Sequence, residues 1–428
     1  MASPILWQNE DATITLIDIP TSITTAQGTV QHPCHDRILS SEPLTAPFAA
    51  NEPKSAPAKA KLMTNSVDED LHAEYAALLS TALQEVRNRY EGAWCLPRPF
   101  VQPPSKKRKR DANGEEPEST CVEALLPHQE PPGLLSRLAR PVRGDASVPR
   151  VRLQSGQRDG GSTETARSID LPSLISSADS EPAQLLITTN DKEDTFRYRI
   201  PPTSSFYLGD CADSNSFRNA VRQHSAQQDT TYLFDFILLD PPWPNRSVRR
   251  THQTKGSTYN VLTTVETIQD LLLGMDLDML MQQDCRVGIW ITNKRAVRDL
   301  VLGDGGLFAA WGLKLEEEWI WLKTTVDGQP VSDLNALWRK PYEVFLLGRR
   351  SLDYDVGTSD TELKRRVVVG VPDLHSRKPS LKALIESLLL VSRSQRVLEV
   401  FARHLVAGWC SWGDECIKFN WDGYWLKT

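Results

Sequence analysis

The sequence predicts an α/β fold, a largely parallel sheet with helices on both faces, built mainly from the second half of the chain. Helical stretches, notably 265–273 and 380–390, alternate with apolar runs, as in parallel sheets. Ten of the twelve tryptophans follow position 240, so the large apolar side chains that a core requires are concentrated there. Five short apolar runs have the composition of strands buried on both faces, at residues 234–239, 287–291, 344–347, 365–369 and 397–401.

Three regions are expected along the chain. Residues 1–100 form an N-terminal region with one helix near 71–90, where leucine, alanine and valine recur at helical spacing. Residues 101–195 are rich in Pro, Ser, Gly and charge, a composition that predicts a disordered linker. The N-terminal half as a whole is therefore expected to be largely disordered and partly helical. Residues 196–428 form the α/β domain.

Composition and charge narrow the class of protein. The formal net charge of -6 excludes a general basic field, so any nucleic acid must bind a local basic face. The seven cysteines include no Cys-x-x-Cys pair, which favours a reducing compartment and argues against structural zinc. No apolar run approaches the ~20 residues of a membrane span. We expect a soluble, intracellular protein that binds neither membrane nor metal.

A run of five consecutive basic residues, Lys106 to Arg110, follows prolines in the expected linker. Such a run repels itself and stays solvated. We interpret it as a nuclear import signal and expect the protein in the nucleus. The alternatives are a plain solvated charge run and a loose nucleic-acid tether.

The first apolar run ends in Asp240-Pro241-Pro242-Trp243. Two prolines fix the backbone and lack N–H groups, so this rigid loop presents only acceptors. Acceptors on both hydrogens of a planar amine draw its nitrogen toward tetrahedral geometry and free the lone pair. Asp240 and the Pro241 carbonyl are the expected acceptors, and Trp243 is expected to stack on the ring. The alternative is a strand-end turn whose tryptophan belongs to the core.

Six further stretches follow in order: Trp290–Lys294, Glu318–Lys323, Arg339–Glu343, His375–Pro379, Leu398–Arg403 and Gly408–Glu415. Together with the Asp-Pro-Pro-Trp loop they resemble the MT-A70 family of adenine methyltransferases over about residues 196–428. The resemblance is greatest to its methyltransferase-like protein four branch. It implies a Rossmann-like methyltransferase sheet with a permuted motif order, in which the catalytic loop precedes the donor-binding strand. It also implies S-adenosylmethionine as cofactor and the N6 amine of adenine in nucleic acid as methyl acceptor.

The resemblance implies that Lys378 meets the methionine carboxylate of the donor. Pro379 is expected as the first residue of the following helix, whose free N–H groups would add to the lysine charge. Arg403 is expected to contact the ribose or tail of the donor. Two roles are open for Glu399, orientation of Arg403 and direct contact with the ligand.

Two shorter matches complete the expected donor site. Asp210 and Cys211 resemble the segment that holds the adenine of the donor. Asp414 and Glu415 align with a Gly-Asn-Glu or Gly-Asn-Gln stretch that binds ribose hydroxyls. Asp414 replaces the asparagine of the family, and a carboxylate can accept a hydrogen bond but not donate one. His404 is expected to be structural.

The substrate face is expected to follow the catalytic loop. A local basic segment there could hold phosphates, and its alternative is an exposed mobile loop; it contains Arg246, Arg249, Arg250, His252 and Lys255. Base-pocket candidates from the matched motifs are Asn293, Lys323, Lys340 and Glu343. Structural pairing, such as Lys340 with Glu343, is the alternative for these. Core positions are expected for Trp319, Trp321, Trp409 and Trp412.

Several alternatives remain open from the sequence. A catalytically silent, nucleic-acid-binding subunit is the competing interpretation, which the Asp414 difference favours and the intact Asp240 and Trp243 oppose. Cytosine and a glutamine amide also offer planar amines. RNA and DNA are both compatible, including small nuclear RNA with 2′-O-methyladenosine. In either polymer the target base must be unpaired or flipped out.

Overall fold

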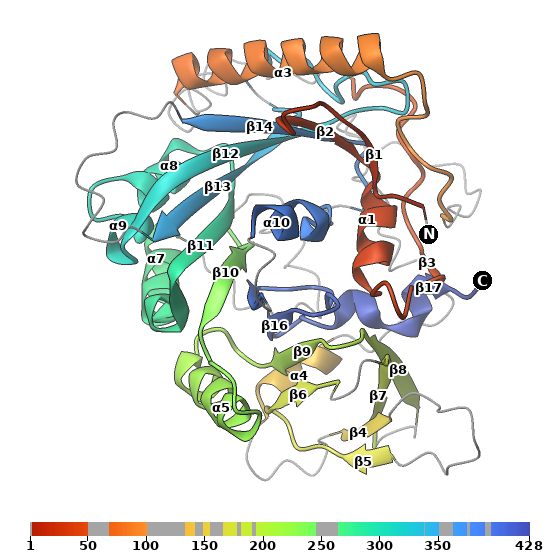
Figure 1. The fold of residues 1–428 in the computed structure, drawn as a ribbon, viewed down its shortest axis with the longest axis vertical. Coiled ribbons are helices and arrows are strands. Elements are labelled where there is room, and N and C mark those ends of the chain that lie inside the picture. The colour runs from red at the N-terminus through yellow and green to blue at the C-terminus, as the bar shows by residue number, and fades with distance from the viewer. Residues whose placement is uncertain are drawn as a thin grey trace, which may run out of the picture.

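The computed structural model describes residues 2–49, 68–100, 133–141, 149–154, 166–177, 181–190, 194–244, 264–337, 339–350, 363–374, 377–389 and 395–428. Within these residues, an eleven-stranded twisted sheet forms the centre of the molecule (Figure 1). Its strand order is β1 (Ile5–Gln8), β2 (Ile14–Ile17), β14 (Lys364–Gly370), β12 (Leu313–Lys323), β13 (Tyr342–Arg350), β11 (Met281–Ile291), β10 (Phe234–Leu239), β15 (Val397–Val400), β16 (Cys410–Gly413), β9 (Ser205–Leu208) and β6 (Leu174–Ser176).

The sheet is mixed but mostly parallel. Six of its ten pairings are parallel and four antiparallel. β10 lies between two parallel neighbours, β11 and β15, and all six of its residues are buried. The five apolar runs fall in β10, β11, β13, β14 and β15, with Phe401 one residue beyond the last strand. The predicted α/β class is confirmed.

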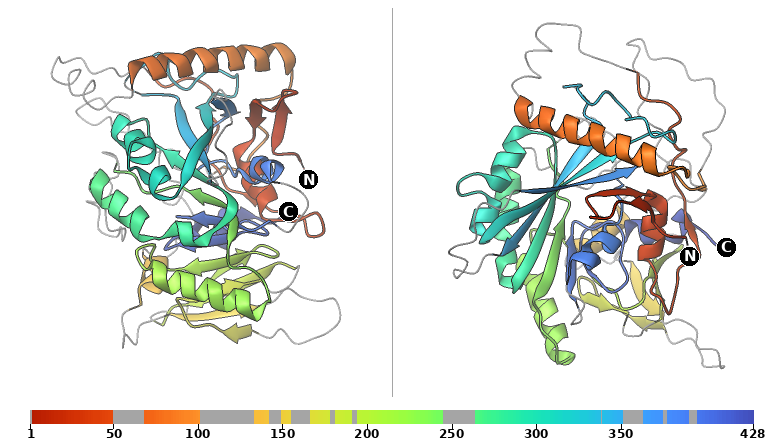
Figure 2. Two further views of the ribbon diagram at one scale, coloured as in Figure 1. Left: turned by 60° about the vertical axis from the view of Figure 1, so that its left-hand side comes forward. Right: turned by 45° about the horizontal axis from the view of Figure 1, so that its top comes forward.

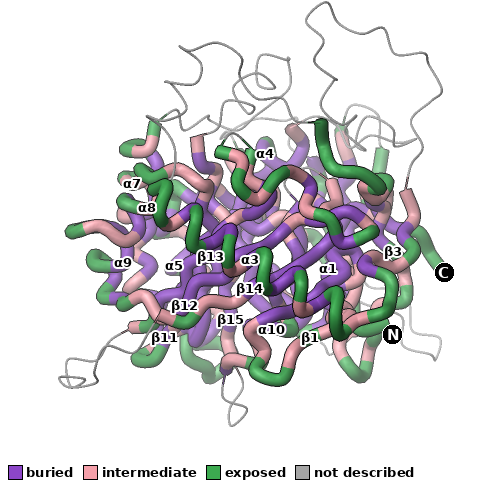
Figure 3. The backbone as a smooth tube through the Cα atoms, turned by 90° about the horizontal axis from the view of Figure 1, so that it is seen from above, coloured by how far each residue is buried: buried purple, intermediate pink, exposed green. Residues whose placement is uncertain are grey.

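Helices cover both faces of the sheet (Figure 2). One core contains residues of α3 (Glu69–Arg89), α5 (Ser214–Gln227), α7 (Val265–Gly274), α8 (Arg295–Leu302) and α9 (Leu307–Ala310). The other contains residues of α1 (Ile19–Ala26), α4 (Leu134–Ala139) and α10 (Lys382–Leu388). Short 3-10 turns are η2 (Leu277–Leu280), η3 (Lys418–Asn420) and η4 (Asp422–Tyr424). Buried positions run through the interior, and exposed positions lie at the periphery and along the outer side of elements such as α3 (Figure 3).

The N-terminal region belongs to this same unit. β2 pairs in parallel with β14 and so extends the sheet. α3 packs on the sheet through Tyr75, whose hydroxyl donates to Glu318 Oε2 at 3.0 Å. The prediction of a largely disordered N-terminal half is therefore wrong for these residues, because a four-residue strand that is ambiguous alone is stabilised by its neighbour in the sheet.

The expected linker also contains regular structure. α4 and β6 lie within 101–195, together with β4 (Arg150–Gln154), β5 (Ala166–Ser168) and β7 (Ala183–Thr188). The last three form a second, antiparallel sheet with β8 (Thr195–Ile200), in the order β5-β4-β7-β8. The disorder prediction is wrong for these residues, because each strand contributes too few apolar residues to outweigh the polar composition around it. The basic run at 106–110 lies outside the described residues.

The two ends of the chain meet in a third, two-stranded sheet. β3 (Arg37–Ile38) pairs antiparallel with β17 (Trp425–Leu426). Of the helices in the described ranges, none has the length and apolar character to cross a membrane.

The burial of α3 predicts that it unfolds together with the sheet. Leu79 is fully buried, so Leu79→Ala should lower the free energy of unfolding by about 2–5 kcal/mol through lost burial and a residual cavity. Leu426→Ala, at a half-exposed position, is the matched control and should change it by much less. Urea denaturation followed by fluorescence should show one transition. A separate early transition for α3 would contradict the single unit.

Candidate active site

The candidate site lies at one edge of the main sheet. β10, β11 and β12 all end at this edge, and the antiparallel β13 begins there. β14 and β15, each parallel to one of these strands, also end there. Polar residues at or just beyond the strand termini are therefore brought together, as is usual for ligand sites in open α/β sheets.

An ion-pair cluster occupies the centre of this edge. Lys378 Nζ lies 3.0 and 3.1 Å from the two carboxylate oxygens of Asp240. It also lies 3.2 Å from Glu343 Oε2, while the other oxygen of Glu343 pairs with Lys323. Burial opposes the charged form of Glu343, but the two lysines hold its pKa at about 2. Burial acts against the charge of Lys378 too, but Asp240 and Glu343 outweigh it and raise its pKa.

The loop Asp240–Trp243 is held in place by a hydrogen bond within its own backbone and by contacts with the core. The Trp243 amide donates to the Pro241 carbonyl at 2.8 Å. The Trp243 side chain is only 7% exposed, and its indole N–H donates to the Trp290 carbonyl at 2.6 Å. Lys294 Nζ donates to the Pro244 carbonyl. The expectation that Trp243 stacks on a base is not met, because its ring is packed in the core as an anchor of the loop.

The loop nevertheless presents its acceptors outward at Asp240. The Asp240 side chain is 32% exposed although the strand that precedes it is buried throughout. The Pro241 carbonyl already accepts one hydrogen bond, but a carbonyl oxygen has a second lone pair. Asp240 is thus the half-exposed acceptor of the loop, whereas Pro241 is buried and its role as the second acceptor stays a prediction.

Glu399, in β15 beside β10, adds a second carboxylate next to Asp240. Burial, followed by the nearby negative charge of Asp240, raises the pKa of Glu399 to about 8. Within the described part of the chain no basic side chain pairs with it. Two residues later, Phe401 adopts a left-handed backbone with φ of 59°, a strained conformation that is common at functional sites.

Arg140, directly after α4, joins two of the predicted donor-site residues. Its Nε lies 2.6 Å from Asp210 Oδ2, and a terminal nitrogen lies 3.3 Å from Asp414 Oδ2. Burial acts to raise the pKa of Asp210, but the hydrogen bond from Arg140 outweighs it and the pKa is lowered. The neighbouring Cys211 is buried, and burial raises the pKa of its thiol. Sequence reasoning missed Arg140 because it fell in the expected linker.

Arg403 and Glu415 lie together at the same edge. Arg403 Nε is 3.4 Å from Glu415 Oε2, and Lys418 Nζ is 3.4 Å from the other oxygen. Glu415 Oε2 is buried and accepts no hydrogen bond within the described residues. The adjacent His404 is buried, and burial lowers its pKa to about 4, in keeping with a structural role.

The base-pocket candidates separate into different roles. Asn293 Nδ2 donates to the Tyr342 carbonyl at 2.7 Å and so ties the end of β11 to the start of β13. Structural pairing, the alternative for these residues, is found for Lys323 with Glu343 but not for Lys340. Its Nζ is buried without a hydrogen-bond partner among the described residues, and burial lowers its pKa to about 8.

The basic segment of residues 246–255 lies outside the described residues. The core positions expected for Trp319, Trp321, Trp409 and Trp412 are confirmed.

The helix expected from Pro379 starts later. α10 begins at Lys382, so Pro379 is not its first residue and Lys378 does not directly precede it. The physical reason is that Ser380 is held by Ser22, whose hydroxyl accepts the Ser380 amide at 3.0 Å.

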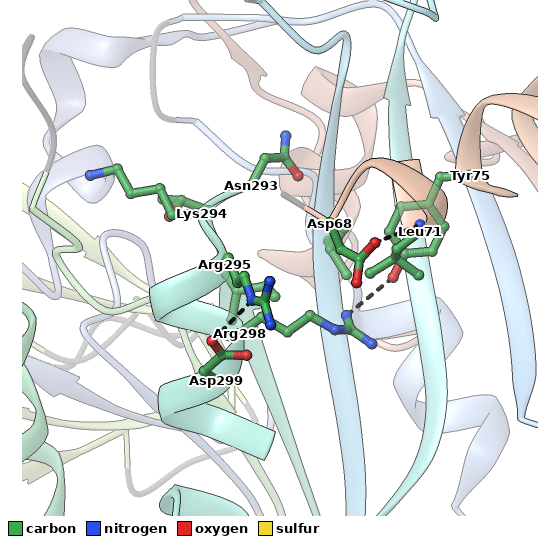
Figure 4. Close-up of a pocket in the computed structure, with 11 residues that line it drawn as sticks. Asp68, Leu71, Tyr75, Asn293, Lys294, Arg295, Arg298 and Asp299 are labelled. Atoms are coloured by element: carbon green, nitrogen blue, oxygen red, sulfur yellow. Dashed lines mark hydrogen bonds and ion pairs between the residues drawn. The ribbon is translucent and has the colours of Figure 1, made fainter. Parts of the chain in front are cut away.

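A cavity of about 130 Å³ lies between the start of α3 and α8 (Figure 4). Arg298 reaches across it from α8 to the Tyr75 hydroxyl at 3.1 Å. Neither Asp240 nor Lys378 lines this cavity, so it is separate from the ion-pair cluster. In the described ranges, no group of three or more His, Cys, Asp or Glu is arranged to hold a metal.

The chain is similar in sequence to known proteins. The MT-A70 family model matches residues 234–415. The chain is 32% identical to the N6-methyladenosine RNA methyltransferase MTA1 of Cryphonectria parasitica, over 100% of this chain and 95% of the relative. It is 30% identical to the protein of the same name from Pyricularia oryzae, over 100% and 98%. The chain belongs to the MT-A70 family. The N(6)-adenine-specific methyltransferase METTL4 of Mus musculus is 28% identical over 68% of this chain and 57% of its own length.

The permuted motif order predicted for an MT-A70 protein is present in the structure. Asp240 follows the central strand β10, and Glu399 lies later in the chain on the adjacent β15. The side chains at this edge also suit a cationic, hydroxyl-bearing ligand. Glu399 carries a carboxyl group without a cation, and Glu415 a buried oxygen without a hydrogen bond. A sulfonium compound with ribose hydroxyls would satisfy both.

The raised pKa of Glu399 predicts a pH-dependent stability. Its folded-state pKa of about 8 exceeds the unfolded value, so the folded protein keeps this proton up to a higher pH than the unfolded chain does. The free energy of unfolding should therefore fall by about 1–3 kcal/mol from pH 5 to pH 8 through this residue. Glu399→Gln should flatten that pH dependence in denaturation experiments without ligand. Glu10→Gln, at an exposed position, should leave it unchanged. Equal slopes for Glu399→Gln and the wild type would refute the assignment.

Proposed function

We propose that this protein transfers a methyl group from S-adenosylmethionine to the N6 amine of adenine in nucleic acid. The observation that carries the proposal is the Asp240 carboxylate, held by Lys378 at the open edge of the sheet and followed by a loop without N–H groups at its two prolines. The MT-A70 match and the named activities of the relatives support it.

The residues of the loop prepare the amine. Asp240 and the Pro241 carbonyl accept its two hydrogens, which frees the nitrogen lone pair. Lys378 fixes the direction of the Asp240 carboxylate through both oxygens, so it needs no reorganisation when the base arrives. Trp243 keeps the loop in place through the Trp290 carbonyl rather than through contact with the base.

S-adenosylmethionine, when bound, supplies an electrophilic methyl group on a positively charged sulfur. Glu399, beside Asp240, would be available to offset that charge, and Glu415 could accept from a ribose hydroxyl. Asp210 and Cys211 follow β9 and remain the candidates for the adenine of the donor. Arg403 remains the candidate for its ribose or tail.

RNA is the polymer that the relatives favour. The two relatives matched over nearly their whole lengths are named RNA methyltransferases. A relative from Caenorhabditis elegans, 29% identical over 53% of this chain, is named a DNA N6-methyl methyltransferase. The target adenine would be unpaired or flipped out, because a stacked base cannot reach the Asp240 carboxylate. The basic run at 106–110 supports a nuclear location.

Mass spectrometry of nucleosides tests this function. Purified protein and S-adenosylmethionine are incubated with single-stranded RNA and DNA of the same sequence, with and without a 2′-O-methyl group on the adenosine. N6-methyladenosine should accumulate in the RNA. If no methylated adenine forms and calorimetry shows no binding of the donor, the catalytically silent subunit is the correct assignment. Methylated cytosine alone would also refute the proposal.

Asp240→Asn should abolish most of the activity without loss of fold. The variant keeps the shape of the side chain but loses the charge that accepts from the amine, so kcat should fall at least about 100-fold. The control is Asp284→Asn at the other end of β11, whose side chain is 60% exposed, and it should retain kcat within about twofold. Methyl transfer and thermal unfolding are measured on both. A wild-type rate for Asp240→Asn would remove Asp240 from the mechanism.

A further inference from the structure

The second sheet, β5-β4-β7-β8, has one buried face and one solvated face. Alternate residues such as Val151, Leu185 and Ile187 are buried in the core shared with α1 and α10. The residues between them point the other way and, apart from the buried Thr188, are exposed or half-exposed. This alternation is typical of an antiparallel sheet that covers a core on one side.

The solvated face is basic and free of acids. The four strands contain five arginines and no Asp or Glu, and the register places all but Arg167, which lies opposite the buried Leu153, on this face. The register places Arg152 and Arg197 in one row, because both pair with Leu186 of β7. Arg150 lies two residues from Arg152, on the same face. We call Arg150, Arg152 and Arg197, with the neighbouring Gln154, Gln184 and Ser168, the arginine face.

Among the residues that the structure describes, no acid neutralises the three arginines of the arginine face. Arg150, Arg152 and Arg197 are exposed and form no ion pair in the described part of the chain. Arg199, which lies opposite Gln184 on the same face, is the neutralised one, since it pairs with Asp36 at 2.6 Å and stacks over Trp425. Three unpaired cations side by side are unfavourable for folding, and they stand in a chain of net charge -6.

The spacing of these side chains suits a chain of anions. Neighbouring strands lie ~4.8 Å apart, so Arg152 and Arg197 are ~10 Å apart across β7. Arg150 and Arg152 are ~7 Å apart along β4. Guanidinium groups bind phosphate oxygens through paired N–H groups, and amides and hydroxyls add further donors. A protein partner would require an apolar centre, and Leu186 alone does not provide one.

We propose that the arginine face binds the phosphodiester backbone of the nucleic acid whose adenine is methylated at the Asp240 edge. This extends the proposed function, since the partner is its substrate. At the Asp240 edge, Lys323 and Lys378 are already neutralised by Glu343 and Asp240. The arginine face would therefore supply affinity for the polymer without base specificity, while the Asp240 loop selects the base.

The test compares two double variants of the full chain with the same change in charge. Arg152→Gln with Arg197→Gln removes two cations of the arginine face. Arg89→Gln with Arg349→Gln is the control, since those side chains are 60% and 48% exposed and lie outside this sheet. Fluorescence anisotropy gives Kd for single-stranded RNA and DNA oligonucleotides of one sequence at several salt concentrations. Equal thermal unfolding temperatures establish that both variants fold.

The arginine-face variant should bind about tenfold more weakly than the control variant. The slope of log Kd against log salt should shrink by about 1.4, the value for two lost phosphate contacts on a single strand. In methylation assays KM should rise while kcat is retained. Equal Kd and equal slope for the two variants, with RNA and with DNA, would overturn the proposal. Because anisotropy requires no methyl transfer, absence of methylation with this binding pattern would refute the proposed function alone.

Discussion

The bridge from Lys378 to Asp240 and Glu343 is the interaction on which the catalytic edge depends. It joins the end of β10, the start of β13 and the segment after β14, three parts of the chain far apart in sequence. Without the lysine, the Asp240 and Glu343 carboxylates would face each other near a third carboxyl group, that of Glu399. A partly buried cation that contacts two carboxylates offsets their repulsion, and its loss leaves uncompensated charge.

This bridge also explains the electrostatic asymmetry of the site. Glu343 is held ionised by two lysines, whereas Glu399 has no cationic partner among the described residues and a pKa raised to about 8. The edge therefore has a neutralised side and a side that favours an incoming positive charge. A sulfonium donor and a neutral adenine amine require that division, with the acceptors of Asp240 between them. The buried indole of Trp243 and the hydrogen bond from Asn293 to Tyr342 hold the strand ends around Asp240 in place. Their proposed role is structural rather than direct contact with the reacting atoms.

The sequence predicted the features whose signals are local. The apolar run of β10 and the two prolines after it define a buried strand and a stiff loop within ten residues. The alternation of strands and helices then predicted a site at the carboxyl ends of the strands, where the structure brings Asp240, Lys378 and Glu343 together. The orientation of Trp243 was not predictable, because an indole at a strand end can face either solvent or core. The bond from Lys378 to Asp240 was not predictable either, because 138 residues separate them.

The amount of regular secondary structure in the first half of the chain was underestimated for a related reason. β2 and β4 are short, and each becomes stable only through a neighbour far away in sequence. Averaged composition hides this, since a few alternating valines and leucines lie among prolines, serines and arginines. Arg140 was missed for the same reason, because its acidic partners Asp210 and Asp414 come 70 and 274 residues later in the sequence.

A double-mutant cycle on methyl transfer tests most directly whether Lys378 acts through Asp240. Lys378→Met, Asp240→Asn and the double variant are compared with the wild type by kcat at saturating donor and RNA. If the lysine serves to hold the carboxylate, the double variant should be no slower than Asp240→Asn, within about threefold, because residues acting as a unit are not additive. If the two losses multiply, Lys378 acts independently on another group, such as the carboxylate of the donor, and the positioning role of the lysine is contradicted.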